Sequence, residues 1–269
     1  MIFLYCLLLL FVILIILYLF AIAPSSNLHS VEEFRDVRFA HRGLHGNGVP
    51  ENSMKAFSLA AEKGFGIELD IHLTKDNRVV VIHDYDTKRV CGKSLCVEDS
   101  TYIELCGLWL ENTNQKIPLF EDVLKLVDGK IPILVELKSK GTKTTLCPFA
   151  AKTLDDYKGK YCIESFSPFI VSWFFKNRKN VVRGQLSQKM KTVGGNNFKN
   201  KLLGFILTNL LTNFITRPTF IAYNYKDVSN LSVKLCKNLF KTPIFAWTLK
   251  GAKIQKNVEG NFFAYIFEQ

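Results

Sequence analysis

Residues 66–84 read GIELDIHLTKDNRVVVIHD, and their polar side chains interrupt two segments that otherwise have the composition of buried β-strands. Because side chains alternate along a strand, Glu68, Asp70 and His72 project from one face of the first segment, and the apolar residues occupy the other. The two carboxylates then lie about 7 Å apart on the same side of the strand. This stretch therefore predicts a charged group of side chains within a largely apolar sheet.

A hairpin would bring the second histidine to the same face. A two-residue turn at Asp76-Asn77 pairs Lys75 with Arg78 and, counted back, places Asp70 opposite His83. Removing carboxylates from water costs several kcal/mol each unless a cation or hydrogen bonds compensate. Paired acids therefore indicate a hard cation such as Mg²⁺ or Ca²⁺. A strand that overhangs into solvent is the alternative, and a zinc site with histidine ligands also stays open.

A third acid follows in IPILVELK (131–138), where Glu136 stands alone in an apolar strand two residues before Lys138. A barrel of parallel strands gathers the carboxyl ends of its strands at one rim. Glu136 and Lys138 can therefore meet the acids of residues 66–84 there. The alternative is a salt bridge on an edge strand.

Residues suited to binding a phosphate group precede these strands, in the stretch FAHRGLHGNGVPENSMKAF (39–57). His41 and Arg42 end a strand, and Gly43 allows a close approach of the backbone. Residues 51–53 open a helix, whose amides and dipole favour an anion. Arg42 offers a planar fork to phosphate oxygens, and Lys138 adds a point charge.

The rest of the chain alternates strands and helices, which favours a TIM (β/α)8 barrel. Helices are expected at residues 51–64, 119–127, 148–157 and 168–177. With residues 78–84 set aside as a hairpin partner, eight barrel strands are expected, at residues 37–41, 67–73, 131–138, 161–166, 181–186, 219–224, 243–249 and 262–267.

Five motifs in this order, HRG (41–43), PEN (50–52), ELD (68–70), HD (83–84) and ELK (136–138), resemble the glycerophosphodiester phosphodiesterase family. The similarity runs from about Arg38 to the C-terminus, and ESFSP (164–168) and AWTL (246–249) also look like strand ends of the family. The ending IFEQ (266–269) departs from the ITD-type ending of many relatives. The resemblance implies a TIM barrel that hydrolyses glycerophosphodiesters to an alcohol and glycerol 3-phosphate.

The resemblance also implies roles for individual residues. One divalent cation, Mg²⁺ or Ca²⁺ with Mn²⁺ as a further choice, would be held by Glu68, Asp70 and Glu136, and Glu51 lies near the metal in some relatives. His41 and His83 would be the general acid and base, a task that suits imidazoles at neutral pH. Arg42 and Lys138 would bind phosphate, and Trp247 would line the site or pack beside it. Neither His45 nor His72 takes a catalytic position. A neighbouring glycerol hydroxyl would attack phosphorus, and the cyclic intermediate would then be hydrolysed.

Residues 1–23 contain no charged side chain and are long enough to span about 30 Å of hydrocarbon as a helix. They lack a basic N-terminal region, which favours a retained single-pass anchor over a cleaved signal peptide, although AIA before Pro24 would suit cleavage. A linker is expected at 24–36 and the barrel at 37–269. Arginines after the span favour a cytoplasmic barrel, and seven cysteines without paired spacing mildly favour a reducing compartment.

The net charge of +11 is concentrated between Ser165 and Lys226, where no Asp or Glu occurs. Such a tract beside an anchor attracts anionic lipid, or it is a solvated basic face. Nucleic acid is not expected as a partner, because no stacking motif or recognition helix accompanies the charge. No feature of the sequence indicates an oligomeric state.

Two other functions stay open. Residues 202–215 (LLGFILTNLLTNFI) would suit an enzyme that acts on phospholipid or lysophospholipid headgroups, if they lie in the membrane interface rather than in a barrel helix and its loop. A non-catalytic, membrane-tethered binding module is the other reading.

Overall fold

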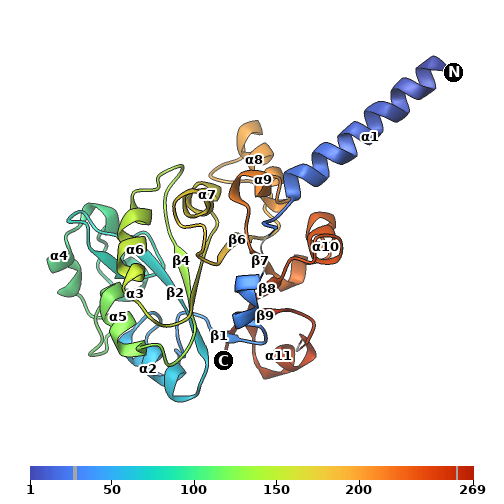
Figure 1. Ribbon diagram of the computed structural model, residues 1–269. Coiled ribbons are helices and arrows are strands. Elements are labelled where there is room, and N and C mark those ends of the chain that lie inside the picture. The colour runs from blue at the N-terminus through green and yellow to red at the C-terminus, as the bar shows by residue number, and fades with distance from the viewer. Residues whose placement is uncertain (27–28, 259) are drawn as a thin grey trace.

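Eight parallel strands close into a barrel in the computed structural model, which describes residues 1–26, 29–258 and 260–269. β1 pairs with both β2 and β9, so the ring is complete within the described residues (Figure 1). The predicted TIM barrel is thus confirmed, with every expected strand in the ring. The strands are β1 (Arg38–Ala40), β2 (Gly66–Leu73), β4 (Ile133–Leu137), β5 (Tyr161–Ser165), β6 (Arg183–Ser187), β7 (Phe220–Asn224), β8 (Ile244–Lys250) and β9 (Ala264–Glu268).

Helices surround this ring, as Figure 1 shows. The outer helices are α2 (Met54–Glu62), α5 (Phe120–Val127), α6 (Leu146–Asp155), α7 (Pro168–Asn177), α8 (Phe198–Thr208), α9 (Asn213–Thr216), α10 (Leu231–Asn238) and α11 (Ala252–Val258). The chain between β3 (Val79–Val81) and α5 adds the short α3 (Lys88–Cys91) and α4 (Tyr102–Cys106).

The alternation predicted for β2 is present. Ile67, Leu69 and Ile71 face outward into the layer beneath the helices, where they join one buried apolar cluster. The barrel interior is filled by a second apolar cluster that includes Phe39, Phe220 and Phe245. The rings of Phe220 and Phe245 stack with centroids 4.0 Å apart. This apolar filling makes the interior a packed core, so polar chemistry is confined to the rim.

The β2–β3 hairpin differs from its predicted register by one residue. Ile71 pairs with Val81, and the amide of Ile82 donates to the carbonyl of Asp70 (3.0 Å), so Asp70 is not opposite His83. The cause is a three-residue loop, closed by the amide of Thr74 donating to Arg78 O (2.9 Å), with Asn77 in the left-handed region at φ 60°. His83 still reaches the rim because β3 ends at Val81.

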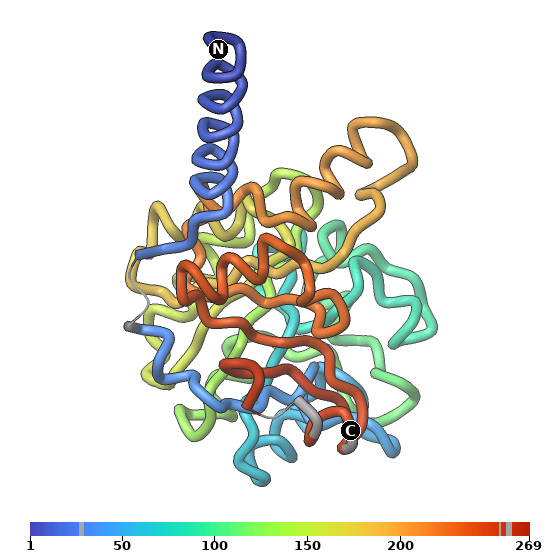
Figure 2. The backbone as a smooth tube through the Cα atoms, turned by 90° about the vertical axis from the view of Figure 1, so that its right-hand side faces the viewer, coloured from blue at the N-terminus to red at the C-terminus, as the bar shows by residue number. Residues whose placement is uncertain are grey.

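The N-terminal helix α1 (Ile2–Ile22) is long and apolar enough to cross a membrane. It projects from the barrel beside α9 and α10 (Figures 1 and 2). Its last turns are attached to the barrel: the Tyr18 hydroxyl lies 2.8 Å from Ser232 Oγ, and Asn213 Nδ2 donates to Ile22 O (3.0 Å).

The linker expected at 24–36 includes residues 27 and 28, which lie outside the described residues. Within the same stretch, the 3₁₀ helix His29–Phe34 buries Val31 and Phe34 against the barrel interior. The domain boundaries at 24 and 37 stay predictions.

Candidate active site

Adjacent barrel strands bring acids to the same level of the rim. The parallel register places Asp70 of β2 beside Glu136 of β4, and Glu136 beside Glu164 of β5. Ligand oxygens of Glu68, Asp70 and Glu136 all lie within 4.8 Å of one another, and the three side chains are buried. The strand pairing therefore assembles the three acids that the sequence singled out.

One lysine only partly compensates this group. Lys138 Nζ lies 3.0 Å from Asp70 Oδ1 and 2.7 Å from Glu136 Oε1. Burial opposes ionisation of Asp70, but Lys138 and His83 outweigh it and hold its pKa far below the ordinary value. Burial raises the pKa of Glu136 to about 7 despite Lys138, and burial with repulsion from Asp70 raises the pKa of Glu68 strongly.

Burial first, and repulsion between the carboxylates second, thus disfavour the charged forms of Glu68 and Glu136, and a bound cation would offset both effects. Three converging carboxylates are hard oxygen ligands of the kind that Mg²⁺ and Ca²⁺ accept. The donor set of Glu68, Asp70 and Glu136 therefore fits a divalent cation.

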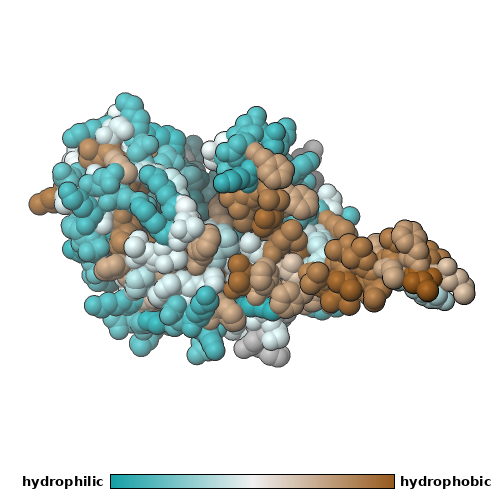
Figure 3. Space-filling view, turned by 90° about the horizontal axis from the view of Figure 1, so that it is seen from above, coloured by the Kyte–Doolittle hydropathy of each residue, from teal (hydrophilic) through white to brown (hydrophobic). Residues whose placement is uncertain are grey.

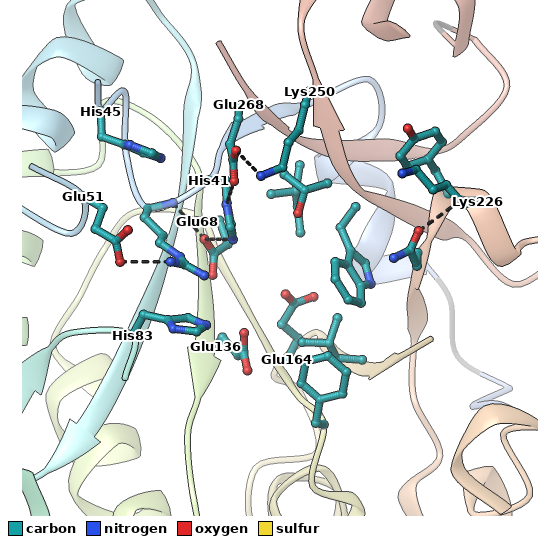
Figure 4. A pocket seen from close by; sticks show the side chains of 18 of the residues that line it. His41, His45, Glu51, Glu68, His83, Glu136, Glu164, Lys226, Lys250 and Glu268 are labelled. Atoms are coloured by element: carbon teal, nitrogen blue, oxygen red, sulfur yellow. Dashed lines mark hydrogen bonds and ion pairs between the residues drawn. The ribbon is translucent and has the colours of Figure 1, made fainter. Parts of the chain in front are cut away.

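His41 follows β1 and is fixed at both its backbone and its ring. Its amide donates to Phe267 O (2.9 Å), and its Nδ1 lies 2.6 Å from Glu268 Oε1 (Figure 4). Lys250 Nζ lies 2.6 Å from the other oxygen of Glu268. The Nε2 atom of His41 is 4.0 Å from Glu68 Oε2, so the free ring nitrogen faces the acid cluster.

His83 is held in the same manner. Its Nδ1 lies 2.6 Å from Asp84 Oδ1, and Asp84 Oδ2 accepts from Arg89 Nε (2.6 Å). Burial lowers the pKa of His83 and thereby favours its neutral form. Each imidazole has a carboxylate at Nδ1, which leaves Nε2 available for proton transfer.

The HRG and PEN motifs form the wall beside the acids. Arg42 adopts φ 55°, and its amide donates to Glu68 Oε2 (2.9 Å). Gly43 follows at φ 77°, where an added Cβ would lie 2.8 Å from Ala56 Cβ, so this position needs glycine. Asn52 Nδ2 donates to Asp70 Oδ2 (2.8 Å). These motifs therefore orient the carboxylates.

Glu51, expected as a metal ligand, lies beside the three-acid cluster rather than within it. Arg42 Nη1 donates to its Oε1 (2.9 Å), and Arg89 contacts both of its oxygens at 2.6 and 2.9 Å. The pKa of Glu51 is lowered, because these two arginines outweigh burial. In this structure Glu51 therefore forms ion pairs with two arginines and lies outside the group of three acids.

The side chains border one cavity of about 630 Å³, drawn in Figure 4. Two acids of the cluster, the two histidines, Arg42 and Lys138 line it. Apolar side chains also line it, namely Phe166, Leu186, Trp247 and Ile266, together with the polar Asn224 and Lys226. The rings of Trp247 and Phe166 meet edge to face at 5.7 Å. The cavity therefore suits a ligand with a charged centre and a less polar substituent.

Comparisons with known proteins agree with this geometry. The model of the glycerophosphoryl diester phosphodiesterase family matches residues 41–190. The chain belongs to this family. The Bacillus subtilis protein YhdW, named provisionally as a glycerophosphodiester phosphodiesterase, is 30% identical over 222 residues, covering 80% of this chain and 86% of YhdW. A Bacillus altitudinis glycerophosphodiester phosphodiesterase is 41% identical over 111 residues, but the match covers 39% of this chain and 45% of that protein.

The fold is also that of solved phosphodiesterases. A crystallised phosphodiesterase of Oleispira antarctica, in complex with the product sn-glycerol-3-phosphate, matches with a TM-score of 0.69 at 17% identity. The match covers 87% of this chain and 94% of the Oleispira chain. The predicted family and barrel are confirmed.

The structure brings together nearly every residue predicted from the glycerophosphoryl diester phosphodiesterase motifs. Eight of them line the cavity, and Asp70 lies buried beside Glu136, while His72 is buried with Nε2 3.2 Å from the carbonyl of His83. His45, given no role, also lines the cavity. The eight are His41, Arg42, Glu51, Glu68, His83, Glu136, Lys138 and Trp247.

Sequence reasoning did not find Glu268, Lys250, Glu164 or the Asp84–Arg89 pair. Two of these residues stand in stretches that the family resemblance singles out: Asp84 in the HD motif and Glu164 at the start of ESFSP. Glu268 belongs to the IFEQ ending, which departs from the ITD-type ending of many relatives, and it contacts His41. Glu164 is buried, and its Oε2 has no hydrogen-bond partner among the described residues.

Proposed function

We propose that this chain is a divalent-cation-dependent phosphodiesterase that hydrolyses glycerophosphodiesters to an alcohol and glycerol 3-phosphate. The carrying observation is a cluster of three buried carboxylates. Two of them, Glu68 and Glu136, line one cavity with two imidazoles that are each backed by an acid at Nδ1. Membership of the family supports the reaction, and the Oleispira neighbour binds glycerol 3-phosphate.

The two histidines exchange the protons of the reaction. Nε2 of one imidazole removes the proton from the attacking hydroxyl, and Nε2–H of the other protonates the leaving alkoxide. Glu268 and Asp84 each accept from Nδ1–H, which stabilises the imidazolium form that arises when Nε2 takes a proton. When the attacking group is the neighbouring glycerol hydroxyl, water completes the reaction by opening the cyclic phosphate.

Arg42 and Lys138 hold the phosphate group. Arg42 Nε forms no hydrogen bond among the described residues and lies 3.6 Å from Asp70 Oδ2, so its donor stands beside the acid cluster, where a phosphate oxygen would bind. Lys138 contributes charge from the opposite side of the cluster. Trp247, which lines the cavity, borders the glycerol or the headgroup.

Glu68, Asp70 and Glu136 would hold the cation, which when bound supplies positive charge to phosphate oxygens. Glu51 acts beside them through Arg42 and Arg89. Mg²⁺ or Ca²⁺ suits the carboxylate set best, and Mn²⁺ is a further choice.

Residues 1–23 anchor the enzyme as a single membrane span, with the barrel on the cytoplasmic side. The support is a helix of 21 residues without charge, whose last turns are attached to α9 and α10. The described cysteines are free, in keeping with a reducing compartment.

The test is product identification with the full chain in detergent micelles. Glycerophosphocholine is supplied with Mg²⁺, Ca²⁺ or Mn²⁺, or with EDTA, and phosphorus NMR follows the products. Glycerol 3-phosphate that forms only with cation supports the proposal. Phosphocholine as the product, or no turnover from folded chain, contradicts it, and the latter favours the binding-module reading.

Phospholipid or lysophospholipid headgroups are the second candidate substrates. The favouring observation is that Phe166, Leu186, Trp247 and Ile266 line the same cavity, because apolar side chains suit a substituent longer than glycerol. Comparing turnover of glycerophosphocholine with that of lysophosphatidylcholine decides between them, because only the second carries an acyl chain.

A further inference from the structure

Helix α8 exposes its large apolar side chains. Phe198, Leu202 and Phe205 are spaced by four and three residues, so they lie on one helix face, and they are 79%, 46% and 59% exposed. The buried face contains Gly204 and Leu207. A surface helix ordinarily turns its apolar face to the core, so the outer face of α8 requires a cover other than this chain's own core.

The helix is seated firmly on the barrel. A Cβ on Gly204 would lie 3.1 Å from Met190 O, so α8 approaches the preceding loop closely. The amide of Met190 donates to Thr208 Oγ1 (2.8 Å), and Ser187 Oγ donates to Leu207 O (2.8 Å). These contacts hold the apolar face outward.

The surroundings of this face are basic. Lys189, Lys191, Lys199 and Lys201 are exposed on α8 and the loop before it. No Asp or Glu occurs between Ser165 and Lys226. The cores of protein interfaces are depleted in lysine, whereas an apolar face bordered by lysines is typical of a helix in the interface of an anionic bilayer.

The membrane-spanning helix lies on the same side of the molecule. Figure 2 shows α8 rising from the barrel toward the side on which α1 projects. Figure 3 shows hydrophobic surface running from α1 onto the neighbouring part of the barrel. The link is α9, where the exposed Phe214 meets Phe20 of α1 with ring centroids 5.6 Å apart. The attachment of Tyr18 to Ser232 gives the barrel a defined tilt relative to α1.

Helix α8 is connected to the catalytic cavity through β6 and the residues that follow this strand. It follows β6, whose Leu186 lines the cavity. Gln188 at the end of β6 lies 3.5 Å from Asn224, another lining residue, and the amide of Lys189 donates to Asp227 (3.2 Å). The loop between β6 and α8 therefore links this helix to the side of the cavity formed by β6 and β7.

We propose that α8 is a second membrane contact. Phe198, Leu202 and Phe205 enter the headgroup layer of the bilayer that α1 spans, by roughly 5–10 Å, and Lys199 and Lys201 contact anionic lipid. The cavity rim between β6 and β7 is then held at the membrane surface, where a diester that carries an acyl chain enters directly. This proposal rests on the membrane anchor under the proposed function, but not on the reaction.

The test places an indole on the exposed face and measures its contact with lipid. Full-length Phe205→Trp is reconstituted in vesicles of phosphatidylcholine and phosphatidylglycerol, with or without dibrominated phosphatidylcholine as quencher. Ile103→Trp is the matched control, because Ile103 is 79% exposed on α4, far from α1 (Figure 1). Each variant adds tryptophan fluorescence to that of the wild type. Brominated lipid should quench this added fluorescence in Phe205→Trp but not in Ile103→Trp. Equal retention in both variants overturns the proposal and indicates a protein cover, such as a second copy.

Charge and turnover provide independent readouts. Adding Lys199→Glu and Lys201→Glu to Phe205→Trp should reduce the quenching in anionic vesicles, and unchanged quenching overturns the assigned role of the lysines. The triple variant Phe198→Ser, Leu202→Ser, Phe205→Ser should lose turnover of vesicle-bound lysophosphatidylcholine and keep that of soluble glycerophosphocholine. Equal loss of both overturns the substrate-entry role. If the wild type cleaves neither substrate, the phosphodiesterase proposal fails, while quenching still decides the membrane contact.

Discussion

Nδ1 of His41 lies 2.6 Å from Oε1 of Glu268, and 227 residues separate the two in the chain. The barrel closes by pairing β1 with β9, so the ends of the first and last strands become neighbours. The hydrogen bond from His41, together with Lys250, lowers the pKa of Glu268 to about 2. Glu268 is therefore ionised at neutral pH and fixes the ring that faces the acid cluster.

Replacing Glu268 should slow the reaction without removing substrate binding. In Glu268→Ala, His41 loses its orientation and the charge that stabilises its imidazolium form. We expect kcat to fall roughly 10- to 100-fold. This is less than the full rate enhancement of about 10²–10⁴ that a positioned general acid or base supplies, because His41 itself stays in place. Steady-state kinetics check this, and the kcat of Glu268→Gln should lie between those of Glu268→Ala and the wild type. A change in KM alone would contradict the positioning role.

The two histidines should be individually indispensable. His41→Ala and His83→Ala each remove one proton-transfer group, so turnover should fall by about 10²–10⁴ while the fold persists. Turnover and circular dichroism on the same samples check this. His45→Ala is the matched control, since His45 lines the cavity but contacts no acid of the cluster by a hydrogen bond among those described. Substantial turnover by either alanine variant would refute the assignment.

Cation affinity should fall as the pH falls. Burial raises the pKa of Glu136 to about 7 and raises that of Glu68 as well, so protons compete with the cation for these carboxyls. Half-saturating Mg²⁺ should rise from pH 8 to pH 6, by up to about tenfold per pH unit for each displaced proton.

Calorimetric titration of Mg²⁺ at both pH values measures the change. Glu136→Gln should weaken binding, whereas Glu121→Gln, at an exposed acid paired with Arg78, should not. A pH-independent affinity would exclude these carboxyls as ligands.

His72 should make the fold sensitive to mild acid. Burial lowers the pKa of His72 to about 4, below its ordinary 6.5. The unfolded chain thus binds the proton more tightly, so stability falls as the pH drops from about 6.5 toward 4. The full effect is about 3 kcal/mol. Urea unfolding between pH 7.5 and 5 checks this, and His72→Gln should show a smaller decline. Parallel curves for the two proteins would contradict it.

The sequence predicted those parts of the fold that depend on local pattern. Alternation in β2 and isolated acids in apolar strands indicated which faces and rims the acids occupy, and the strand register confirms it. The hairpin register was wrong because it depends on Asn77 adopting a left-handed backbone, which lengthens the loop by one residue. Glu268 was missed because its partner is known only after barrel closure. For residues 202–215 the sequence left a membrane-interface segment and a barrel helix both open, because periodicity does not show which face of the helix is covered.

The most direct measurement is the initial rate of glycerol 3-phosphate release from glycerophosphocholine, by the full chain and by Asp70→Asn. Asp70 joins the cation cluster, Lys138 and Asn52, so its charge is central to the proposed site. We predict cation-dependent release by the wild type that EDTA abolishes and that Asp70→Asn reduces by at least about 10²-fold. Release that persists in EDTA, or equal rates for the two proteins, would contradict the proposed chemistry.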